Sequence, residues 1–285
     1  MNKFALVQNP VPLVKIQNLT KIYGVADSQA RNDELHTSAK NPSATNSSVE
    51  NPSAKNMSVK MQKQRKHRKA LDAVNLQIES GRIIGLLGEN GCGKTTLLKI
   101  LAGLLTVTAG EVSIAGQRIG AKTKAVTSFL PDADFLEKSI TPREAFAIYD
   151  DFFPDFELEK ARSLLAFLGL EENWRYQSMS KGMREKLKLA LVMSRRARLY
   201  LLDEPISGVD PAAREVLLNT ILRGWNPDST LIISTHLITD IEAVLDEAIL
   251  MRHGQILMHR NVDELREEYD ASLDQIFRKE YANVR

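Results

Sequence analysis

The sequence predicts an α/β fold built around a doubly wound, mostly parallel sheet, and three observations support this prediction. The chain has 285 residues, which is enough for one full hydrophobic core and a small subdomain. Strand-like apolar runs alternate with helical stretches in its second half. The run "IIGLLG" is continuously apolar, as expected of a parallel strand that is buried on both faces.

Composition and charge narrow the class of protein. Hydrophobic residues make up 43% of the chain, charged residues 26%, and the formal net charge is +2. These values are typical of an ordinary globular protein and exclude a disordered chain or a dedicated polyanion binder. The single cysteine excludes an internal disulfide framework, and no apolar run approaches the roughly 18 residues of a bilayer span. We therefore expect a cytoplasmic protein whose membrane role, if it has one, depends on a partner.

The N-terminal part contains a strand and then a long irregular segment. Alternating apolar residues in "VPLVKIQNLTKIYG" predict a short strand at a sheet edge. Residues 25–68 lose this periodicity and contain the repeats "NPSATNSSVE" and "NPSAKNMSVK", which predict a flexible low-complexity insertion in place of a hairpin loop. The insertion ends in the basic cluster Lys60–Lys69, for which we expect a solvated linker. Contact of this cluster with nucleic acid or anionic lipid headgroups is the alternative.

The remaining elements follow in a regular order. "ALDAVNLQI" predicts a strand, "ESGR" a turn and "IIGLLG" a buried strand, after which residues 141–196 have a helical pattern. The apolar runs "LYLLDE" and "TLIISTH" predict two further strands, separated by a helix over about 212–222. "AILMRHGQILMH" predicts a hairpin, and a charged helix is expected from about Val262 within a C-terminal extension, 261–285.

A glycine-rich motif, "GENGCGKTT", lies between the "IIGLLG" strand and an amphipathic helix. Glycines in this context let backbone N–H groups surround phosphate oxygens, and the helix N-terminus adds partial positive charge. Lys94 would reach the β and γ phosphates of a nucleotide, and the Thr95 hydroxyl would bind Mg²⁺. Cys92 is expected to fill space, with sensitivity to alkylation as the alternative. The candidate nucleotide-binding residues are Gly88, Glu89, Asn90, Gly91, Cys92, Gly93, Lys94, Thr95 and Thr96.

Acidic residues and a histidine follow two of the predicted strands. Asp203 and Glu204 end "LYLLDE", at the sheet edge where ligands gather in open α/β sheets. Asp203 suits a role in holding Mg²⁺, and Glu204 suits that of general base on an attacking water. A helix N-cap and a surface charge are the alternatives for these two acids. His236 ends "TLIISTH" and is expected to hydrogen-bond the γ-phosphate, although a lone histidine there is more often structural.

Together with "MSKGM" before "LYLLDEP" and "SGVDP" after it, these motifs resemble the ATP-binding subunit of ABC transporters. The resemblance covers nearly the whole chain apart from 25–68. It implies a single ATPase domain over 1–285 with the fold of a P-loop NTPase: a mostly parallel core sheet, an antiparallel β subdomain and a helical signature subdomain over 141–196. It also implies ATP and Mg²⁺ as cofactors.

The resemblance assigns further residues. Ser180 and Gly182 match the signature motif that meets the ATP held by the other subunit of a head-to-tail dimer, and Ser180 would also cap its helix. Asp210 matches the acid of the loop that links the two ATP sites. Tyr23 matches the aromatic residue that stacks on adenine, with core packing as the alternative. Asp132 stands where the family usually has a glutamine that touches Mg²⁺ and the attacking water.

Other departures narrow the resemblance. Lys181 replaces a usual glycine and Met183 a usual glutamine, and with "YDDFFPDF" they resemble bacterial exporter ATPases of antibiotic-peptide or drug efflux. The implied partners are a second ABC-type ATPase, identical or related, and a multi-spanning membrane permease that holds the chain on the cytoplasmic face of the membrane. Two alternatives remain: a soluble ABC-type ATPase that acts on nucleic acid or ribosomes, and a regulatory ATP-binding module with little turnover.

Overall fold

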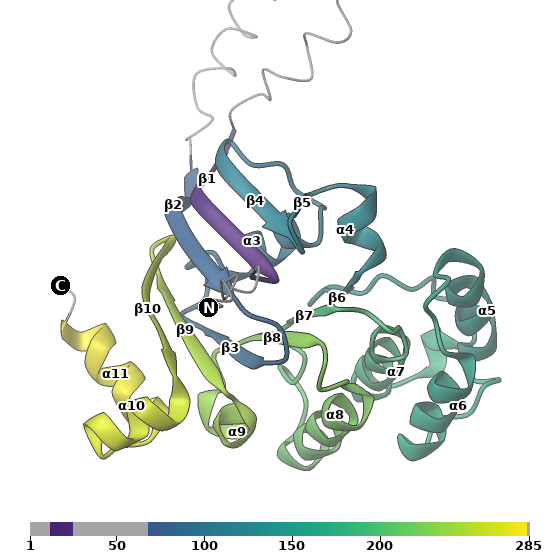
Figure 1. The fold of residues 1–285 in the computed structure, drawn as a ribbon. Coiled ribbons are helices and arrows are strands. Elements are labelled where there is room, and N and C mark those ends of the chain that lie inside the picture. The colour runs from purple at the N-terminus through teal and green to yellow at the C-terminus, as the bar shows by residue number, and fades with distance from the viewer. Residues whose placement is uncertain (1–11, 25–67, 284–285) are drawn as a thin grey trace, which may run out of the picture.

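The computed structural model describes residues 12–24 and 68–283, which form two sheets and the helices around them (Figure 1). The predicted insertion lies outside these ranges apart from Arg68, and so does most of the basic cluster. Among the described helices, none combines the length and the apolar character that a bilayer span requires.

The core sheet has six strands in the order β10-β9-β3-β8-β7-β6. All neighbours in it pair in parallel except β9 and β10, which form the predicted hairpin. The mostly parallel core sheet is thereby confirmed. Every residue of β3, β7 and β8 is buried, which explains the apolar runs in their sequences. The strands are β3 (Ile83–Leu87), β6 (Thr127–Leu130), β7 (Leu199–Asp203), β8 (Thr230–Thr235), β9 (Glu247–Arg252) and β10 (Gln255–Asn261).

The two faces of the core sheet belong to two separate hydrophobic clusters. Ile84 and Leu86 of β3 pack with α3 (Lys94–Leu101) and with the second sheet, whereas Ile83 and Leu87 pack with the helices on the other face. Successive side chains of a strand point to opposite faces, so one short strand contributes to both clusters. The core sheet is therefore covered on both sides, as a doubly wound fold requires.

The second sheet is antiparallel, in the order β2-β1-β4-β5, with β1 (Val14–Tyr23), β2 (Arg68–Ile78), β4 (Ala109–Ile114) and β5 (Gln117–Arg118). The prediction that β1 lies at an edge is wrong, because Val14 pairs with Ile78 of β2 on one side and with Ile114 of β4 on the other. Alternating polarity indicates that one face of a strand is exposed. It does not indicate whether the backbone forms hydrogen bonds with one neighbouring strand or with two. The predicted hairpin is present, since β1 and β2 are antiparallel partners.

Helices occupy the stretch 141–196, as the sequence pattern indicated: α5 (Pro142–Phe152), α6 (Leu158–Phe167), the short 3₁₀ turn η1 (Tyr176–Ser178) and α7 (Lys181–Met193). Thr141 and Glu144 form a reciprocal capping box that fixes the start of α5. The second half of α7 is fully buried against its neighbours. Figure 1 places α5 and α6 at the end of the molecule opposite the C-terminal helices.

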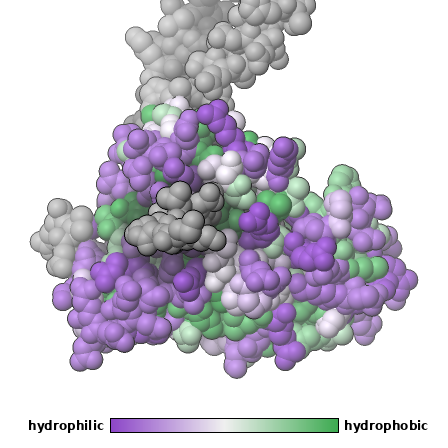
Figure 2. Space-filling model, viewed as in Figure 1, coloured by the Kyte–Doolittle hydropathy of each residue, from purple (hydrophilic) through white to green (hydrophobic). Residues whose placement is uncertain are grey.

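The C-terminal part follows β10 as two helices, α10 (Val262–Tyr269) and α11 (Leu273–Asn283), where the sequence suggested one. The break falls at Asp270, whose φ of 45° is left-handed and ends α10. Figure 2 shows mainly hydrophilic residues over this part of the surface. The remaining helices are α4 (Ala121–Ala125), α8 (Pro211–Gly224), α9 (Ile238–Ile241) and the 3₁₀ turn η2 (Glu242–Val244).

Candidate functional site

The glycine motif connects the C-terminal end of β3 to α3, at the edge of the core sheet. Gly91 and Gly93 have φ values of 82° and 117°, which few residues with a side chain adopt. A Cβ on Gly93 would lie 2.6 Å from the Ala70 carbonyl oxygen, so the loop passes close to β2 only because this residue is glycine. Gly93 is also the N-cap of α3, and the first turn of this helix has no acidic residue. Backbone N–H groups at such a helix start are suited to bind an anion.

Lys94 is the cation of this loop, and its side chain is only 5% exposed. Its Nζ donates to the carbonyl oxygens of Gly88, at 2.6 Å, and Glu89, at 3.3 Å. The same nitrogen lies 3.7 Å from Glu204 Oε1. Hydrogen bonds to two carbonyl oxygens fix the position of the buried Lys94 ammonium.

A carboxylate oxygen without a hydrogen-bond partner lies next to Thr95. Asp203 Oδ1 accepts hydrogen bonds from the Thr95 hydroxyl, at 3.0 Å, and from the Ser234 hydroxyl, at 2.7 Å. Asp203 Oδ2 is buried and has no partner among the described residues. An orphaned buried carboxylate oxygen is costly unless a cation satisfies it, so these residues fit a site for Mg²⁺, which prefers oxygen ligands.

Glu204 and His236 come together from neighbouring strands. Glu204 Oε2 lies 3.0 Å from His236 Nδ1. The backbone of Glu204 has a φ of 52°, and its N–H donates to the Ser234 carbonyl oxygen, at 3.0 Å. Left-handed backbone at a non-glycine residue costs about 1–3 kcal/mol and concentrates at functional sites. The carboxylate thereby faces both Lys94 and His236, which is a suitable place for a general base.

A cavity of about 450 Å³ joins these groups. It is lined by Tyr23, Arg68, Ala70, Asn90, Gly91, Gly93, Lys94, Thr95, Thr96, Asp132, Glu204, Ser207 and His236. Most of the candidate residues therefore meet at one place. The Tyr23 ring is 39% exposed at the rim, and its hydroxyl is 3.3 Å from Thr96 Oγ1, so it does not pack in the core.

Seven candidate residues do not line this cavity: Gly88, Glu89, Cys92, Asp203, Ser180, Gly182 and Asp210. Of these, Ser180, Gly182 and Asp210 lie outside both the glycine loop and β7. Ser180 caps α7 by accepting a hydrogen bond from the Met183 N–H, at 3.3 Å. Asp210 caps α8 in the same way through the Ala213 N–H, at 3.0 Å. Both caps are exposed on the surface.

Cys92 also differs from its neighbours in the loop. It is 6% exposed and packs in the cluster between α3 and the antiparallel sheet, and burial raises the pKa of its thiol. A thiol with a raised pKa forms little thiolate and reacts slowly. Packing of the thiol in this cluster favours a space-filling role for Cys92 over a reactive one.

The loop after β6, which carries Asp132, is attached to η1 and α7 by polar contacts of the half-exposed Asp134. Asp134 Oδ1 accepts from the Tyr176 hydroxyl, at 2.7 Å, and lies 3.4 Å from Nζ of the fully buried Lys188. The Tyr176 hydroxyl holds the pKa of Asp134 below its usual value, with Lys188 contributing in the same direction. Burial, and after it the hydrogen bond to Asp134, raise the pKa of Tyr176. The cavity residue Asp132 is therefore two positions from Asp134, which contacts Lys188 of α7.

Sequence reasoning missed several contributors. Ser234 of β8 pairs with Asp203 of β7. It stands two residues before His236 in "IISTH", on the same face of the strand, and this position was the available signal in the sequence. Arg68 lines the cavity because it is the strand partner of Tyr23. Its neighbour Lys69 forms an ion pair with Asp72, at 3.0 Å, and the rest of the basic cluster is outside the described residues.

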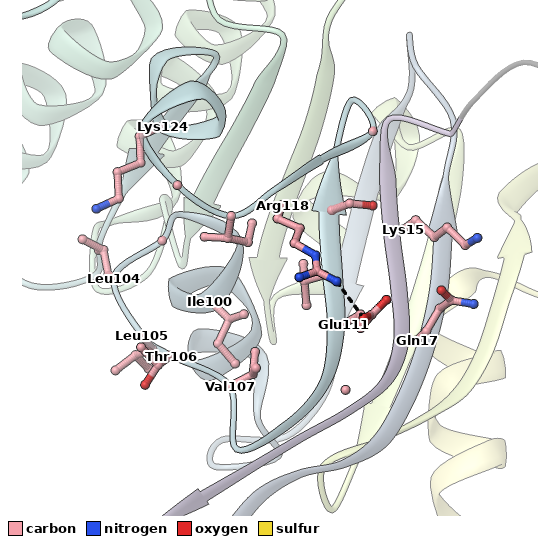
Figure 3. Close-up of a pocket in the computed structure, with 17 residues that line it drawn as sticks. Lys15, Gln17, Ile100, Leu104, Leu105, Thr106, Val107, Glu111, Arg118 and Lys124 are labelled. Atoms are coloured by element: carbon pink, nitrogen blue, oxygen red, sulfur yellow. Dashed lines mark hydrogen bonds and ion pairs between the residues drawn. The ribbon is translucent and has the colours of Figure 1, made fainter. Parts of the chain in front are cut away.

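A second hollow of about 710 Å³ lies elsewhere, between the end of α3, α4 and the strands β1, β4 and β5 (Figure 3). Arg118 and Glu111 form an ion pair across its wall, at 3.1 Å. None of the candidate residues named above lines it. Volume alone would have indicated the wrong cavity, because Lys94, Glu204 and His236 line the smaller one.

Comparisons with known proteins agree with this site. The family described as "ABC transporter" matches residues 71–207. Two curated relatives from Bacillus subtilis are each 29% identical: the uncharacterized ABC transporter ATP-binding protein YxlF, over 74% of this chain and 72% of its own length, and the ABC transporter ATP-binding protein YtrB, over 70% of each. The Nod factor export ATP-binding protein I of a Rhizobium species is 29% identical over 70% of this chain and 68% of its own.

Solved structures match the fold. The ATP-binding subunit of an ABC transporter superposes with a TM-score of 0.70 at 21% identity, covering 94% of this chain and 98% of that one. A nucleotide-free ATP-binding cassette from an ABC transporter gives a TM-score of 0.63, over 91% and 96%. With the phosphate loop, the Asp203–Glu204 pair and His236 around one cavity, these matches identify the chain as an ATP-binding domain of the ABC transporter family, a family of ATPases.

Proposed function

We propose that this chain hydrolyses ATP as the motor subunit of an ABC transporter and acts on a separate membrane-spanning subunit. The observation that carries the proposal is the convergence of Lys94, Glu204 and His236 on one cavity. Asp203 lies behind the cavity residue Thr95, and its buried Oδ2 has no hydrogen-bond partner among the described residues. This is a set of groups for holding phosphates, a cation and an attacking water.

Each residue has a role that follows from its contacts. Lys94 and the N–H groups of the glycine loop would bind the β and γ phosphates. Thr95 and Asp203 would hold Mg²⁺, with Asp132 at the cavity edge as a further oxygen ligand. When bound, the cation would neutralise charge on the phosphate oxygens. Glu204 would accept the proton of the attacking water, and His236 would orient this carboxylate and contact the γ-phosphate.

Tyr23 would hold the adenine. Its ring is 39% exposed at the rim, where a base can stack on it, and the Lys21 ammonium lies 5.7 Å from the ring centroid. Tyr23 also lines the cavity, beside Arg68. Stacking of a base on an aromatic side chain contributes about 1–3 kcal/mol.

A dimer would complete the site. Ser180 and Asp210 are exposed helix caps that do not reach the cavity of their own chain. A second ATPase, identical or related, would receive the α7 N-terminus at its γ-phosphate, where the helix dipole favours the anion. The ATP-binding cassette MJ0796, whose structure is dimeric with ADP and phosphate, aligns with 87% of this chain at a TM-score of 0.65.

The membrane subunit would dock beside α5. A groove of about 630 Å³ runs there, lined by Glu137, Ser139, Ile140, Thr141, Glu144, Ala147, Ile148 and Arg175. Ile148 is 46% exposed, and Phe152 on the same helix is 75% exposed. Exposed apolar residues beside charged ones suit the short cytoplasmic helix of a multi-spanning partner. The chain would then lie on the cytoplasmic face of the membrane.

Export is the proposed direction of transport. Relatives at 29% and 30% identity are named as the Nod factor export ATP-binding protein I and the human phospholipid-transporting ATPase ABCA3, of which this chain spans 68% and 13%. The first of these names states export, which supports the same direction here, and the second states transport of phospholipid.

Affinity purification of the tagged protein from its native cells in mild detergent, with mass spectrometry, tests the proposal. We expect a stoichiometric multi-spanning membrane protein with wild type and its loss with Ile148→Asp. Leu104→Asp is the matched control, since Leu104 is 59% exposed but lies in the other hollow. Ribosomal proteins or nucleic acid in place of a membrane protein would overturn the transporter proposal.

A further inference from the structure

The C-terminal helix α11 returns to the phosphate loop through one side chain. The Tyr281 hydroxyl accepts a hydrogen bond from the Glu89 N–H, at 3.1 Å, across 192 positions of sequence. It also donates to the Met251 carbonyl oxygen at the end of β9. A tyrosine hydroxyl has one donor and can accept, so both of its roles are used at this point.

The contact reaches the catalytic lysine through a single peptide group. The Gly88 carbonyl and the Glu89 N–H belong to the same peptide bond. Its oxygen accepts from Lys94 Nζ, at 2.6 Å, and its N–H donates to Tyr281. Because the peptide group is planar, fixing the direction of its N–H fixes the direction of its C=O. Hydrogen bonds in such a chain also polarise one another.

Tyr281 is itself held firmly. Its ring stacks on Phe277, with centroids 4.4 Å apart, and the Arg252 guanidinium lies 5.2 Å from its centroid. Arg252 Nη1 also donates to the Tyr281 carbonyl oxygen, at 3.0 Å. The space around the hydroxyl is tight, since a Cβ on Gly88 would lie 3.2 Å from it. Burial raises the pKa of this phenol, so it remains the neutral donor and acceptor that the two hydrogen bonds need.

We propose that Tyr281 is a positioning residue for the phosphate loop: by orienting the peptide between Gly88 and Glu89, it places Lys94 for the β and γ phosphates. A role in packing alone would need only the ring, which phenylalanine also has. The hydroxyl is the part that reaches Glu89. The inference rests on the proposed function, because it concerns how the same loop binds ATP.

The variant Tyr281→Phe tests it by removing one oxygen atom and keeping the ring. A non-hydrolysable β,γ-imido analogue of ATP and AMP each compete with a fluorescent nucleotide. We expect the variant to bind the analogue about threefold to tenfold more weakly, the loss of one hydrogen bond. AMP lacks the phosphates that Lys94 reaches, so its affinity should not change. In steady-state hydrolysis the KM for ATP should rise more than kcat falls.

Tyr269→Phe is the matched control, because this tyrosine lies on the adjacent α10 and its described contact is with Lys279, 5.4 Å from its ring. It should bind both nucleotides as wild type does. An unchanged affinity of Tyr281→Phe for the imido analogue, or an equal loss for the analogue and AMP, would overturn the inference. A wild-type protein that binds no analogue at all would overturn the proposed function instead.

Discussion

The substitution Glu204→Gln should abolish turnover and leave ATP binding intact. The amide keeps the size of the carboxylate, and it can still hydrogen-bond His236 Nδ1, which lies 3.0 Å from Oε2. The backbone bond from the Glu204 N–H to Ser234, at 3.0 Å, does not involve the side chain. An amide cannot accept the proton of the attacking water. Since a general base contributes about 10²–10⁴-fold, the barrier should rise by roughly 3–5 kcal/mol.

Binding should not weaken, because the substitution removes a negative charge that lies 3.7 Å from Lys94 and competes with the phosphates for it. Phosphate release at saturating ATP measures turnover, a fluorescent nucleotide measures affinity, and light scattering measures the mass of the complex. We expect an ATP-dependent dimer to accumulate, because the bound ATP is not hydrolysed and the γ-phosphate contacts that hold the dimer persist.

Glu247→Gln is the matched control for this experiment. Glu247 also pairs with a histidine, its Oε2 lying 2.7 Å from His259 Nε2, but it is on the β9–β10 hairpin and outside the cavity. Its turnover should equal that of wild type. Turnover of Glu204→Gln within tenfold of wild type would refute the assignment of Glu204 as the base.

Other outcomes follow from the same structure. Deletion of residues 28–66 should leave a folded protein that hydrolyses ATP, because β1 and β2 already meet as antiparallel partners, and a large fall in melting temperature would contradict this. Asp203→Asn should lower the affinity for Mg²⁺ in an isothermal titration with ATP, since the orphaned oxygen loses its charge. His259 holds the pKa of Glu247 below its usual value, so this pair stabilises the fold above the unfolded pKa and the contribution disappears as the pH falls through the lowered folded pKa; urea unfolding of Glu247→Gln should be less sensitive to acid than that of wild type. Cys92 should react with a maleimide only after unfolding, as followed by mass, because it is buried and its pKa is raised.

Local patterns predicted most of the core sheet. The buried parallel strand β3 has no polar side chain and β8 has the apolar run Leu231–Ile233, so their sequences indicate them without further information. The phosphate loop and the acids after β7 were also predictable, because parallel strands place their carboxyl ends at one edge of a sheet. Most of the residues that these motifs brought together line one cavity.

What the sequence could not supply depends on distant pairing. The interior place of β1 is decided by hydrogen bonds to β2 and β4, and neither partner leaves a mark on the side-chain pattern of β1. Tyr281 reads as an ordinary residue of a charged helix, and its contact with Glu89 exists only because α11 folds back. The break between α10 and α11 depends on the left-handed backbone of Asp270. No glycine or proline stands at this position to indicate a helix end.

Helix α7 is joined to two different nucleotides in the proposed dimer. Its first residues would meet the ATP of the other subunit, while Lys188, two turns later and about 12 Å along the axis, is bound to the loop of its own Asp132 through Asp134. A rigid helix whose first turn would meet one site and whose middle is tied to the loop of the other couples the binding free energies of the two sites, and this coupling is the same in both directions. Occupation of one site therefore changes affinity at the other, and hydrolysis should depend on ATP concentration with a Hill coefficient above one.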